Sequence, residues 1–408
     1  MKLEPKSMKP TIIVIGSADV IKLGLIRSFG ELGYKIISIQ ISGKNKFKMK
    51  PLDYYSKYVS AYYFAKATDL IDLLIDKCTD DVQKPILMPL TDSMVYLIDQ
   101  SLSKLNKYFI FPNVNLQEGG ITRLMNKVLQ KKIAAEAGIN VPKTWEIPFV
   151  DGDFIIPEDI EYPCFVKGSL NYKSKKQYQK RCNNLQELNE LLTLCKRAGV
   201  YDLCAEEYLD IDKEVGIITF SSKTDSAVPA IVDFLEMGKS PKGGISMRGQ
   251  IRPANNRELI QAIKSFLAKT CYVGICNLDF IVSRGKYYFV EVNFRYAAYG
   301  YGIFKSGVKV PEMIVSSLIN DNLGKYVASP NCNRTYFNEK VGLIDVMEGS
   351  ITYKKYKKMR KQSDILMIAD PSDPKPHNML WTLIVNKVLT QVSSMIKKVI
   401  PHRMTVNV

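Results

Sequence analysis

Apolar and polar positions follow a regular rhythm over the first 115 residues. Short apolar runs, typical of buried parallel strands, occupy residues 11–16, 34–40, 85–90 and 108–113. Segments with helical spacing of their apolar residues lie between them, at 17–33, 69–78 and 93–102. This rhythm predicts a parallel sheet covered by helices, ending near residue 115. The turn Gly16-Ser17-Ala18-Asp19 lacks the G-x-G-x-x-G spacing, so we expect a tight turn before a helix there rather than a dinucleotide site.

After residue 120 the pattern changes to a mixture of helices and antiparallel strands. Helical spacing predicts helices at 122–138, where Gly138 is the stop signal, at 186–199 and at 257–270. Strands are predicted within 162–169, where the strand ends in Lys167, and at 203–209, 215–220 and 227–237. We expect a glycine-containing loop over 238–250. Residues 273–295 then predict a β-hairpin that turns at Arg284-Gly285.

The second strand of this hairpin carries polar residues on one face. In YYFVEVNFRY (287–296), Glu291, Asn293 and Arg295 alternate with apolar residues and so share a face. Counting from the turn places Asp279 near residue 290 on the partner strand. Two carboxylates and an amide oxygen are ligands that suit Mg²⁺. A surface ladder of salt bridges is the alternative that the hairpin alone leaves open.

Composition narrows the class of protein. The chain has 408 residues, more than one core comfortably holds, so we expect two or three domains. Eight cysteines without CxxC spacing indicate free thiols in a reducing compartment. The sequence opens on charged residues rather than a secretory signal, and no apolar run approaches the roughly 18–20 residues that span a bilayer. We therefore expect a cytoplasmic protein.

Histidine content and charge exclude some functions and favour others. The only histidines are His377 and His402, which excludes a Ser-His-Asp triad or a histidine-rich zinc site in the body of the chain. The net charge of +16 indicates an anionic partner, such as a nucleotide, a phosphorylated substrate or an acidic membrane surface. No recognisable nucleic-acid-binding module accompanies this charge, so nucleic acid is not expected as a partner.

The order of the candidate residues is more informative than any one of them. Taken singly, Lys127 and Lys167 would be expected to be ordinary solvated lysines. Along the chain, however, they are followed by Glu206-Glu207-Tyr208-Leu209, then by Asp279, then by the Glu-x-Asn-x-Arg strand. This order resembles the ATP-grasp superfamily of carboxylate–amine ligases, and the resemblance covers residues 10–325.

The resemblance implies a fold of mixed α/β and α+β class. An N-terminal parallel α/β domain would occupy residues 1–115, and the ATP-grasp domain would occupy 116–325. The latter would contain a mobile lid subdomain, near 141–209, and a nucleotide- and metal-binding subdomain. Residues 326–408 would form a C-terminal extension.

The resemblance also implies roles for particular residues. Arg295 would face the transferred phosphate or acyl phosphate, so Arg295 and Lys167 are the implied catalytic residues. ATP would be held by Lys127 and Lys167 at the phosphates, by Glu206, Glu207 and Leu209 at the adenine, and by Glu214 at the ribose. Mg²⁺, with Mn²⁺ as an alternative, would be held by Asp279, Glu291 and Asn293.

Two positions depart from the family pattern. The lid loop of many relatives is glycine-rich, whereas here Gly168-Ser169-Leu170 is followed by the lysines at 173, 175, 176 and 180. Backbone amides normally cradle phosphate in such a loop. The lysines of 173–180 either substitute side-chain charge for those amides or only solvate the lid. The proline that follows the metal-binding asparagine in the family is Phe294 here, a difference that we expect to be tolerated.

Three less specific patterns are similar to D-aspartate ligase-like enzymes within the superfamily: PLDYYSKYVS (51–60), PLTDSMVYLI (89–98) and ADPSDPKP (369–376). This implies an ATP-dependent ligase that forms an amide through an acyl phosphate, joining an amino acid or other small carboxylate to an amine of a cell-envelope or peptide-like acceptor. The alternatives are a ligase that makes free dipeptides or modifies a glycan or other small carboxylate, and an ATP-binding module that has lost the chemistry.

Two further segments have alternative interpretations. The loop 239–252 carries Lys242, Arg248 and Arg252, and Lys242 and Arg248 would clamp an acidic substrate unless the loop is simply flexible and exposed. The tail 378–400 has an apolar helical stripe and a polar face with cations but no acid. Such a helix packs on its own domain or on a partner subunit of a dimer, or it lies on an anionic membrane at the cytoplasmic face.

Overall fold

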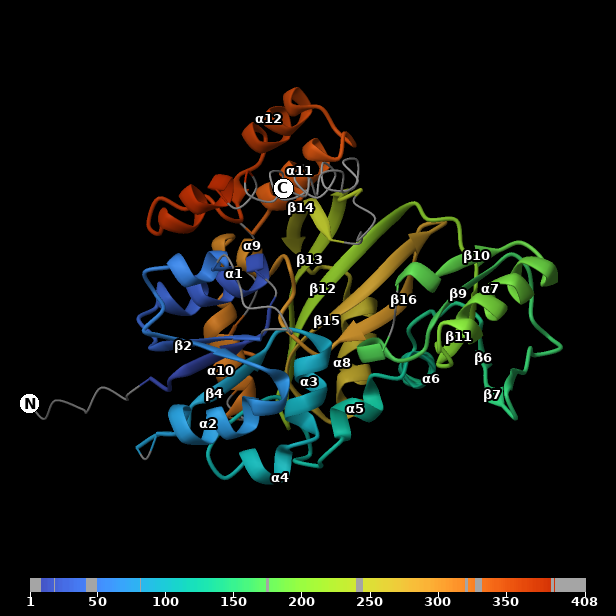
Figure 1. The fold of residues 1–408 in the computed structure, drawn as a ribbon, viewed down its shortest axis with the longest axis horizontal. Helices are drawn as coiled ribbons and strands as arrows, with labels where there is room; N and C mark the ends of the chain where they lie inside the picture. The colour runs from blue at the N-terminus through green and yellow to red at the C-terminus, as the bar shows by residue number, and fades with distance from the viewer. Residues whose placement is uncertain are drawn as a thin grey trace, which may run out of the picture.

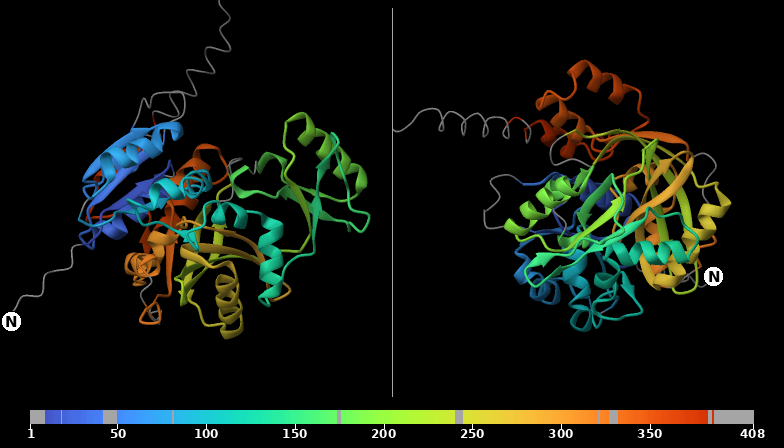
Figure 2. Two further views of the ribbon diagram at one scale, coloured as in Figure 1. Left: turned by 90° about the horizontal axis from the view of Figure 1, so that it is seen from below. Right: turned by 90° about the vertical axis from the view of Figure 1, so that its right-hand side faces the viewer.

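Three sheets organise the molecule (Figure 1). The computed structural model describes residues 9–17, 19–41, 50–80, 82–173, 176–239, 245–319, 322–326, 332–382 and 385. A parallel sheet lies at the N-terminal end, a large sheet occupies the centre, and a small antiparallel sheet projects from the rest of the molecule (Figure 2). This combination confirms the expected mixed α/β and α+β class.

The N-terminal sheet has the strand order β3-β2-β1-β4, with every neighbouring pair parallel. Its strands are β1 (Ile12–Ile15), β2 (Ile36–Ile41), β3 (Ala61–Ala65) and β4 (Ile86–Pro89), accompanied by helices α1 (Asp19–Gly30), α2 (Leu70–Cys78), α3 (Asp92–Asp99) and α4 (Leu102–Leu105). β1 and β4 are buried throughout, as expected of strands with helices on both faces.

Two details of this sheet differ from the prediction. β3 was not predicted, although its sequence AYYFA is a short run of apolar and aromatic residues; most of these residues are only partly buried. The predicted strand 108–113 forms only a single parallel bridge, between Ile110 and Ile86. The chain then turns away as β5 (Asn113–Val114), which pairs with the central sheet at Tyr272 and Val273.

The central sheet has the order β16-β15-β12-β13-β14-β17-β18, with β5 pairing beside this path. Its strands are β12 (Lys213–Ser221), β13 (Ser226–Met237), β14 (Ser246–Pro253), β15 (Tyr272–Ser283), β16 (Lys286–Asn293), β17 (Arg334–Phe337) and β18 (Ile365–Leu366). The predicted hairpin is confirmed: Ser283 pairs with Lys286, and Arg284 and Gly285 both have positive φ, as a two-residue hairpin turn requires.

Helices cover both faces of the central sheet (Figure 1). α6 (Lys127–Glu136) and α8 (Arg257–Thr270) pack on one face, with α5 (Gly120–Leu124) beside them. The other face contacts α9 (Gly300–Lys305) and α10 (Val310–Leu318), which also pack against α1. One hydrophobic core therefore joins this second face to the N-terminal sheet.

The projecting sheet has the antiparallel order β10-β9-β11-β6 and a core of its own. It consists of β6 (Thr144–Ile147), β9 (Cys164–Gly168), β10 (Lys180–Cys182) and β11 (Leu203–Glu207), with the β7–β8 ribbon (Phe149–Val150, Asp153–Phe154) beside it. Helix α7 (Leu185–Arg197) buries Leu188, Leu191, Leu192 and Cys195 against this sheet. We refer to these elements as the lid sheet.

Two sequence predictions need correction. The helix expected over 122–138 is two helices, α5 and α6, because the Asn126 side chain accepts the Leu129 N–H and caps a new helix. The loop expected over 238–250 is in part strand β14, which begins at Ser246. Its alternating Met247, Gly249 and Ile251 face the core that contains Tyr336.

The C-terminal region is built into the fold through a buried ion pair. β17 and β18 extend the central sheet, and α11 (Glu339–Met347) and α12 (Tyr353–Lys361) pack beside them. Beyond these, Asp373 pairs with Arg27 of α1, with 3.0 Å between Arg27 Nε and Asp373 Oδ2. Arg27 also donates to the carbonyls of Ile368 and Asp373, and Ser56 donates to the Asp373 carboxylate. The segment around residue 370 therefore ties the C-terminal region to the N-terminal sheet.

Removing one partner of this ion pair should destabilise the protein strongly. We expect Asp373→Ala to lower the free energy of unfolding by about 3–5 kcal/mol, because it leaves the guanidinium of Arg27 buried without its carboxylate. Urea denaturation followed by circular dichroism measures this difference. Asp153→Ala is the control, since Asp153 pairs with Lys196 at the surface and should leave the free energy of unfolding nearly unchanged. Equal effects of the two variants would contradict the structural role of Asp373.

Candidate active site

A cluster of oxygen-bearing side chains lies where β15 and β16 pair. Asp279 is directly opposite Glu291, and Asn277 is directly opposite Asn293. Asn293 Nδ2 donates to Asp279 Oδ2 at 2.9 Å, and Asn277 Nδ2 approaches Asp279 Oδ1 at 3.4 Å. The structure thus brings together the three residues predicted as metal ligands, and it adds Asn277, which the sequence analysis missed. We refer to these four residues as the carboxylate cluster.

A β-bulge sets which side chains of β16 join this cluster. Asp279 pairs with Glu291, but the next residue, Phe280, pairs with Phe289, so Val290 is the extra residue of the bulge. Phe289 rather than Val290 therefore enters the core with Phe280. The bulge lets β16 bury Phe289 and Val292 on one face while Glu291 stays on the other.

The two carboxylates of the cluster have opposite electrostatic surroundings. Burial and the charge of Glu291 raise the pKa of Asp279. Burial also opposes the charge of Glu291, but Lys127 and Lys167 outweigh it and lower the pKa of that carboxyl. A divalent cation held by the two carboxylates would offset their mutual repulsion with its positive charge.

Helix α6 supplies a lysine to the cluster from the side of the lid sheet. Gln130 holds the helix on the edge of the central sheet: its Oε1 accepts the Val292 N–H at 3.0 Å, and its Nε2 donates to the Val292 carbonyl at 3.2 Å. One turn before Gln130, Lys127 Nζ lies 2.9 Å from Glu291 Oε2. The backbone N–H of Lys127 also donates to the carbonyl of Ser169, next to β9. Lys127 therefore lies between the lid sheet and the carboxylate cluster.

A second group of charges lies within the lid sheet itself. Lys167 of β9 and Lys131 of α6 share one oxygen of Glu206, with Nζ–Oε1 distances of 2.7 Å and 2.6 Å. All three side chains are buried. Burial and the neighbouring Lys167 lower the pKa of Lys131 to about 8. Burial opposes the charge of Lys167, but Glu206 raises the pKa of that lysine.

Lys131 was not predicted from the sequence, although its spacing from Lys127 is a signal. Lys131 follows Lys127 by four residues, so the two lysines lie on one face of α6. That face is buried, and two buried lysines on one helix face require anionic partners. The helical period relates the two lysines, but the apolar pattern does not indicate that their face is buried, because Val128, Leu129 and Ile133 are only partly buried.

Arg295 connects the carboxylate cluster to the N-terminal sheet. Its Nε lies 2.7 Å from Asp92 Oδ1, and its Nη2 lies 3.3 Å from Asn293 Oδ1. Asp92 is the first residue of α3, just beyond the carboxyl end of β4. Ligands of open parallel sheets commonly bind at this edge. Sequence analysis did not identify Asp92, because nothing in the sequence pairs residues 203 positions apart.

The cluster fits a magnesium ion by the chemistry of its donors. Asp279, Glu291, Asn293 and Asn277 present carboxylate and amide oxygens, which are the ligands of a hard cation. The buried Oδ1 of Asn277 has no hydrogen-bond donor in the part of the chain that the structure describes. No group of three or more His, Cys, Asp or Glu side chains suited to a metal occurs among the described residues, so further ligands would come from substrate oxygens or water.

Three implied nucleotide contacts lie near the lid sheet and the cluster. Glu207 ends β11, and its N–H donates to the carbonyl of Lys143. Leu209 follows where the backbone has left the strand ladder. Glu214 is exposed on β12, on the face of Asp279, and its charge contributes to the raised pKa of Asp279. Their roles toward adenine and ribose stay predictions.

The two implied substrate residues are not brought to the cluster. Arg248 pairs with Glu236 at 3.4 Å and donates to Ser363 Oγ. Arg248 and Ile251 lie on opposite faces of β14, because side chains alternate along a strand. Ile251 pairs with Val232, Val232 with Gly216, and Gly216 with Asp279, so Ile251 and not Arg248 shares the face of Asp279. Lys242 lies outside the described residues. An acidic-substrate clamp at these two positions stays a prediction.

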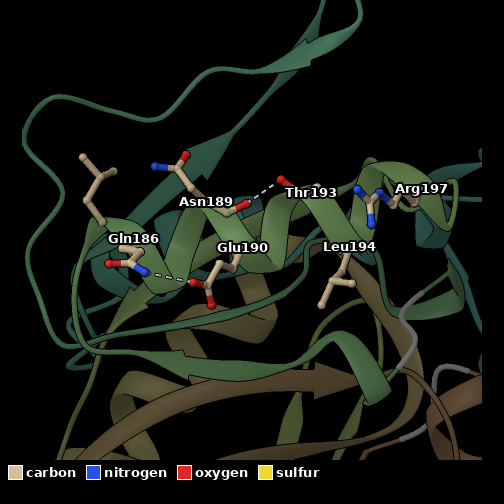
Figure 3. A pocket seen from close by; sticks show the side chains of 7 residues that line it. Gln186, Asn189, Glu190, Thr193, Leu194 and Arg197 are labelled. Carbon is tan, nitrogen blue, oxygen red and sulfur yellow. Dashed lines mark hydrogen bonds between the residues drawn. The ribbon is translucent and has the colours of Figure 1, made fainter.

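A surface hollow on the lid lies away from these charges. Figure 3 shows it along α7, lined by Gln186, Asn189, Glu190, Thr193, Leu194, Arg197 and Leu185, with a volume of about 690 Å³. The opposite face of α7 packs on the lid sheet, so this hollow opens to solvent on the outside of the lid. It contains none of the residues of the carboxylate cluster.

Only the start of the predicted tail helix is described. Residues 375–382 are helical, with Leu380 buried in the core and Trp381 exposed. Most of 378–400 lies outside the described residues, so its packing or membrane contact stays a prediction. Among the residues that the structure describes, no helix is long and apolar enough to cross a membrane.

Comparison with known proteins gives one relative by sequence and several by structure. No protein-family model matches the chain. It is 24% identical over 329 residues to the D-aspartate ligase of Enterococcus faecium, covering 75% of this chain and 76% of that one. The L-amino acid ligase from Bacillus licheniformis has a similar structure, with a TM-score of 0.59, 15% identity and coverage of 81% and 80%. The N5-carboxyaminoimidazole synthetase from Staphylococcus aureus, complexed with ADP, has a TM-score of 0.60, 16% identity and coverage of 87% and 91%.

Each of these similarities covers at least three quarters of the chain. The resemblance expected from the sequence is confirmed, and the chain has the ATP-grasp fold.

Proposed function

We propose that the protein is an ATP-dependent carboxylate–amine ligase. The observation that carries this proposal is the continuous line of charge from the lid sheet to the N-terminal sheet. In this line Lys127 contacts Glu291, Glu291 faces Asp279, and Asn293 joins Asp279 to Arg295. The names of the relatives, a D-aspartate ligase and an L-amino acid ligase, support the same class of reaction.

ATP would bind on the lid side of the carboxylate cluster. Lys127 and Lys167 are the nearest cations to Glu291 there, and both are buried, which strengthens their attraction for phosphate oxygens. Glu206 holds Lys167 and Lys131 in place. The ADP complex of the Staphylococcus aureus synthetase supports a nucleotide in a protein of this fold.

Asp279, Glu291 and Asn293 would hold Mg²⁺, which when bound offsets the negative charge of the phosphates. The substrate carboxylate oxygen attacks the γ-phosphorus, the bond to the bridging oxygen breaks, and ADP leaves. Arg295 stabilises the charge that develops on the acyl phosphate, a task that suits its fixed fork of donors. An amine then attacks the acyl carbon, phosphate leaves, and the amine proton passes to a carboxylate or phosphate oxygen.

The substrate carboxylate would be an amino acid, and the amine would belong to a cell-envelope or peptide-like acceptor. ADP release in the presence of Mg²⁺ tests this proposal, with D-aspartate and the L-amino acids as carboxylates and with amino acids, dipeptides and peptidoglycan precursors as amines. Release that requires both a carboxylate and an amine is the expected result. Dipeptide formation from two free amino acids would identify the free-dipeptide alternative. ATP binding without turnover across the whole panel would refute the ligase function.

Lys131 offers a test of the nucleotide side of the site. We expect Lys131→Met to raise the KM for ATP by about 10-fold, with a smaller effect on kcat, because Lys167 and Glu206 lose the cation that shares their ion pair. Lys132→Met is the control, since Lys132 is exposed on the neighbouring position of the same helix. Steady-state kinetics at varied ATP concentration measure both variants. Identical kinetics of the two would show that Lys131 has no role in ATP binding.

A further inference from the structure

A buried tyrosine hydroxyl lies beside the carboxylate cluster without a hydrogen-bond partner. Tyr299, just before α9, is only 4% exposed, yet its hydroxyl makes no hydrogen bond with any residue that the structure describes. The charge of Asp279 adds to burial in raising the pKa of this hydroxyl, and Arg295 acts in the opposite direction. The phenol therefore lies within electrostatic reach of two residues of the candidate site.

A glycine makes the space for this hydroxyl. Gly216 of β12 pairs with Asp279 of β15, and a Cβ atom at position 216 would lie 2.6 Å from Tyr299 Oη. Any other residue at position 216 would have to displace the tyrosine. The end of the Tyr299 side chain thus occupies the place next to Asp279 on the same face of the sheet.

The position of Tyr299 separates it from the nucleotide side. Asp279 has Glu291 of β16 on one side and Gly216 of β12 on the other. Lys127 and the lid sheet approach from the side of Glu291. Tyr299 approaches from the opposite side. Glu214, the residue implied at the ribose, lies on the same face of β12, but two residues before Gly216 and so further from the Arg295 end of the hairpin. A group bound between Asp279 and Tyr299 would therefore lie closer to Arg295 than Glu214 does, where the substrate that receives the phosphate would bind.

A second buried tyrosine, Tyr336, also packs over a glycine, but its hydroxyl has a partner within the fold. Tyr336 of β17 is 1% exposed, and its ring lies over Gly249 of β14, as Tyr299 lies over Gly216. Its hydroxyl, however, donates to Ser246 Oγ at 2.7 Å. A buried hydroxyl without a partner destabilises a fold, so phenylalanine would be the more stable residue at position 299 if packing were the sole requirement.

We propose that Tyr299 binds the carboxylate substrate, with its hydroxyl donating a hydrogen bond to a substrate oxygen beside Asp279. This inference rests on the proposed ligase function, because it names a contact to the substrate of that reaction. A hydroxyl is a suitable donor here, since it can bind a substrate oxygen without adding a charge to the site. Ligand binding would satisfy the donor that the free protein leaves unpaired.

The experiment compares Tyr299→Phe with Tyr336→Phe in thermal unfolding and in steady-state ADP release. In unfolding, Tyr299→Phe should match or exceed the wild-type midpoint, whereas Tyr336→Phe should lower it because Ser246 loses its donor. In kinetics, Tyr299→Phe should raise the KM of the most active carboxylate of the amino-acid panel by about 10-fold or more, with the KM for ATP unchanged. Tyr336→Phe should retain wild-type kinetics.

Three results would overturn the proposal. The first is a lowered unfolding midpoint for Tyr299→Phe, which would mean that the fold itself uses the hydroxyl. The second is an unchanged KM for the carboxylate in an active enzyme. The third is a raised KM for ATP alone, which would place Tyr299 on the nucleotide side. A wild-type protein that is inactive with the whole panel would refute the ligase function and with it this substrate role, and the unfolding comparison would still show whether the fold holds the hydroxyl.

Discussion

Glu291→Gln should abolish turnover while the protein stays folded. Glu291 is the carboxylate that joins Lys127 to Asp279, and the amide that replaces it carries no negative charge for a divalent cation. We expect kcat to fall by at least about 10²-fold, a loss of the size that removal of one strong electrostatic contact in an active site produces. The Mg²⁺ concentration that gives half of the maximal rate should rise in whatever activity remains. Asn293→Ala should also lower kcat, since Asn293 orients Asp279.

A control must separate loss of the ligand from loss of an ion pair. Asp233 is half-buried in the same sheet and is paired with Arg252 at 2.7 Å, but it lies on the opposite face, toward α8. Asp233→Asn should cost stability and leave kcat unchanged. Circular dichroism and ADP release on both variants complete the comparison. Normal ATP-dependent activity of Glu291→Gln, or equal losses of activity in Glu291→Gln and Asp233→Asn, would contradict the role of Glu291 as a metal ligand.

Part of the carboxylate cluster could be predicted from the sequence because it depends on local rules. The period of two places Glu291 and Asn293 on one face, and the bulge at Val290 falls before both residues. The regular register counted from the turn at Arg284-Gly285 would instead place Val290 opposite Asp279. The bulge, which the sequence does not indicate, puts Glu291 there and Phe289 opposite Phe280.

The residues that were missed depend on contacts between distant segments. Asp92 reaches Arg295 through the packing of the N-terminal sheet on the central sheet, and Tyr299 reaches Asp279 across the space left by Gly216. No propensity or spacing encodes such pairs. Lys131 is the exception, because its relation to Lys127 follows from the helical period alone.

Residues 326–408, expected as an extension, include elements that belong to the main fold. β17 continues the central sheet next to β14, and Asp373 pairs with Arg27 inside the core. Both contacts join segments that are far apart in the chain, so the sequence alone indicates neither. β14 was not predicted for the same reason. Met247, Gly249 and Ile251 pack in a core with Tyr336, which is distant in the chain.

Arg295→Ala should lower the rate by about 10²-fold or more and change the KM for ATP much less. The reason is the position of Arg295: it lies between Asn293 and Asp92, on the side of the cluster away from Lys127, where the acyl phosphate would form. Asp92→Asn should reduce kcat by a smaller factor, because the guanidinium keeps its charge and loses only the carboxylate that orients it.

The control for this variant is closely matched within the same sheet. Arg252 pairs with Asp233 through an Nε–Oδ2 distance of 2.7 Å and is 23% exposed, whereas Arg295 pairs with Asp92 at 2.7 Å and is 21% exposed. Arg252 lies on the face toward α8, so Arg252→Ala removes an equivalent ion pair without touching the cluster. We expect Arg252→Ala to lower the unfolding midpoint and retain the rate at saturating ATP. If Arg295→Ala instead loses ATP binding but keeps its rate at saturating ATP, Arg295 belongs to the nucleotide site and another donor must stabilise the acyl phosphate.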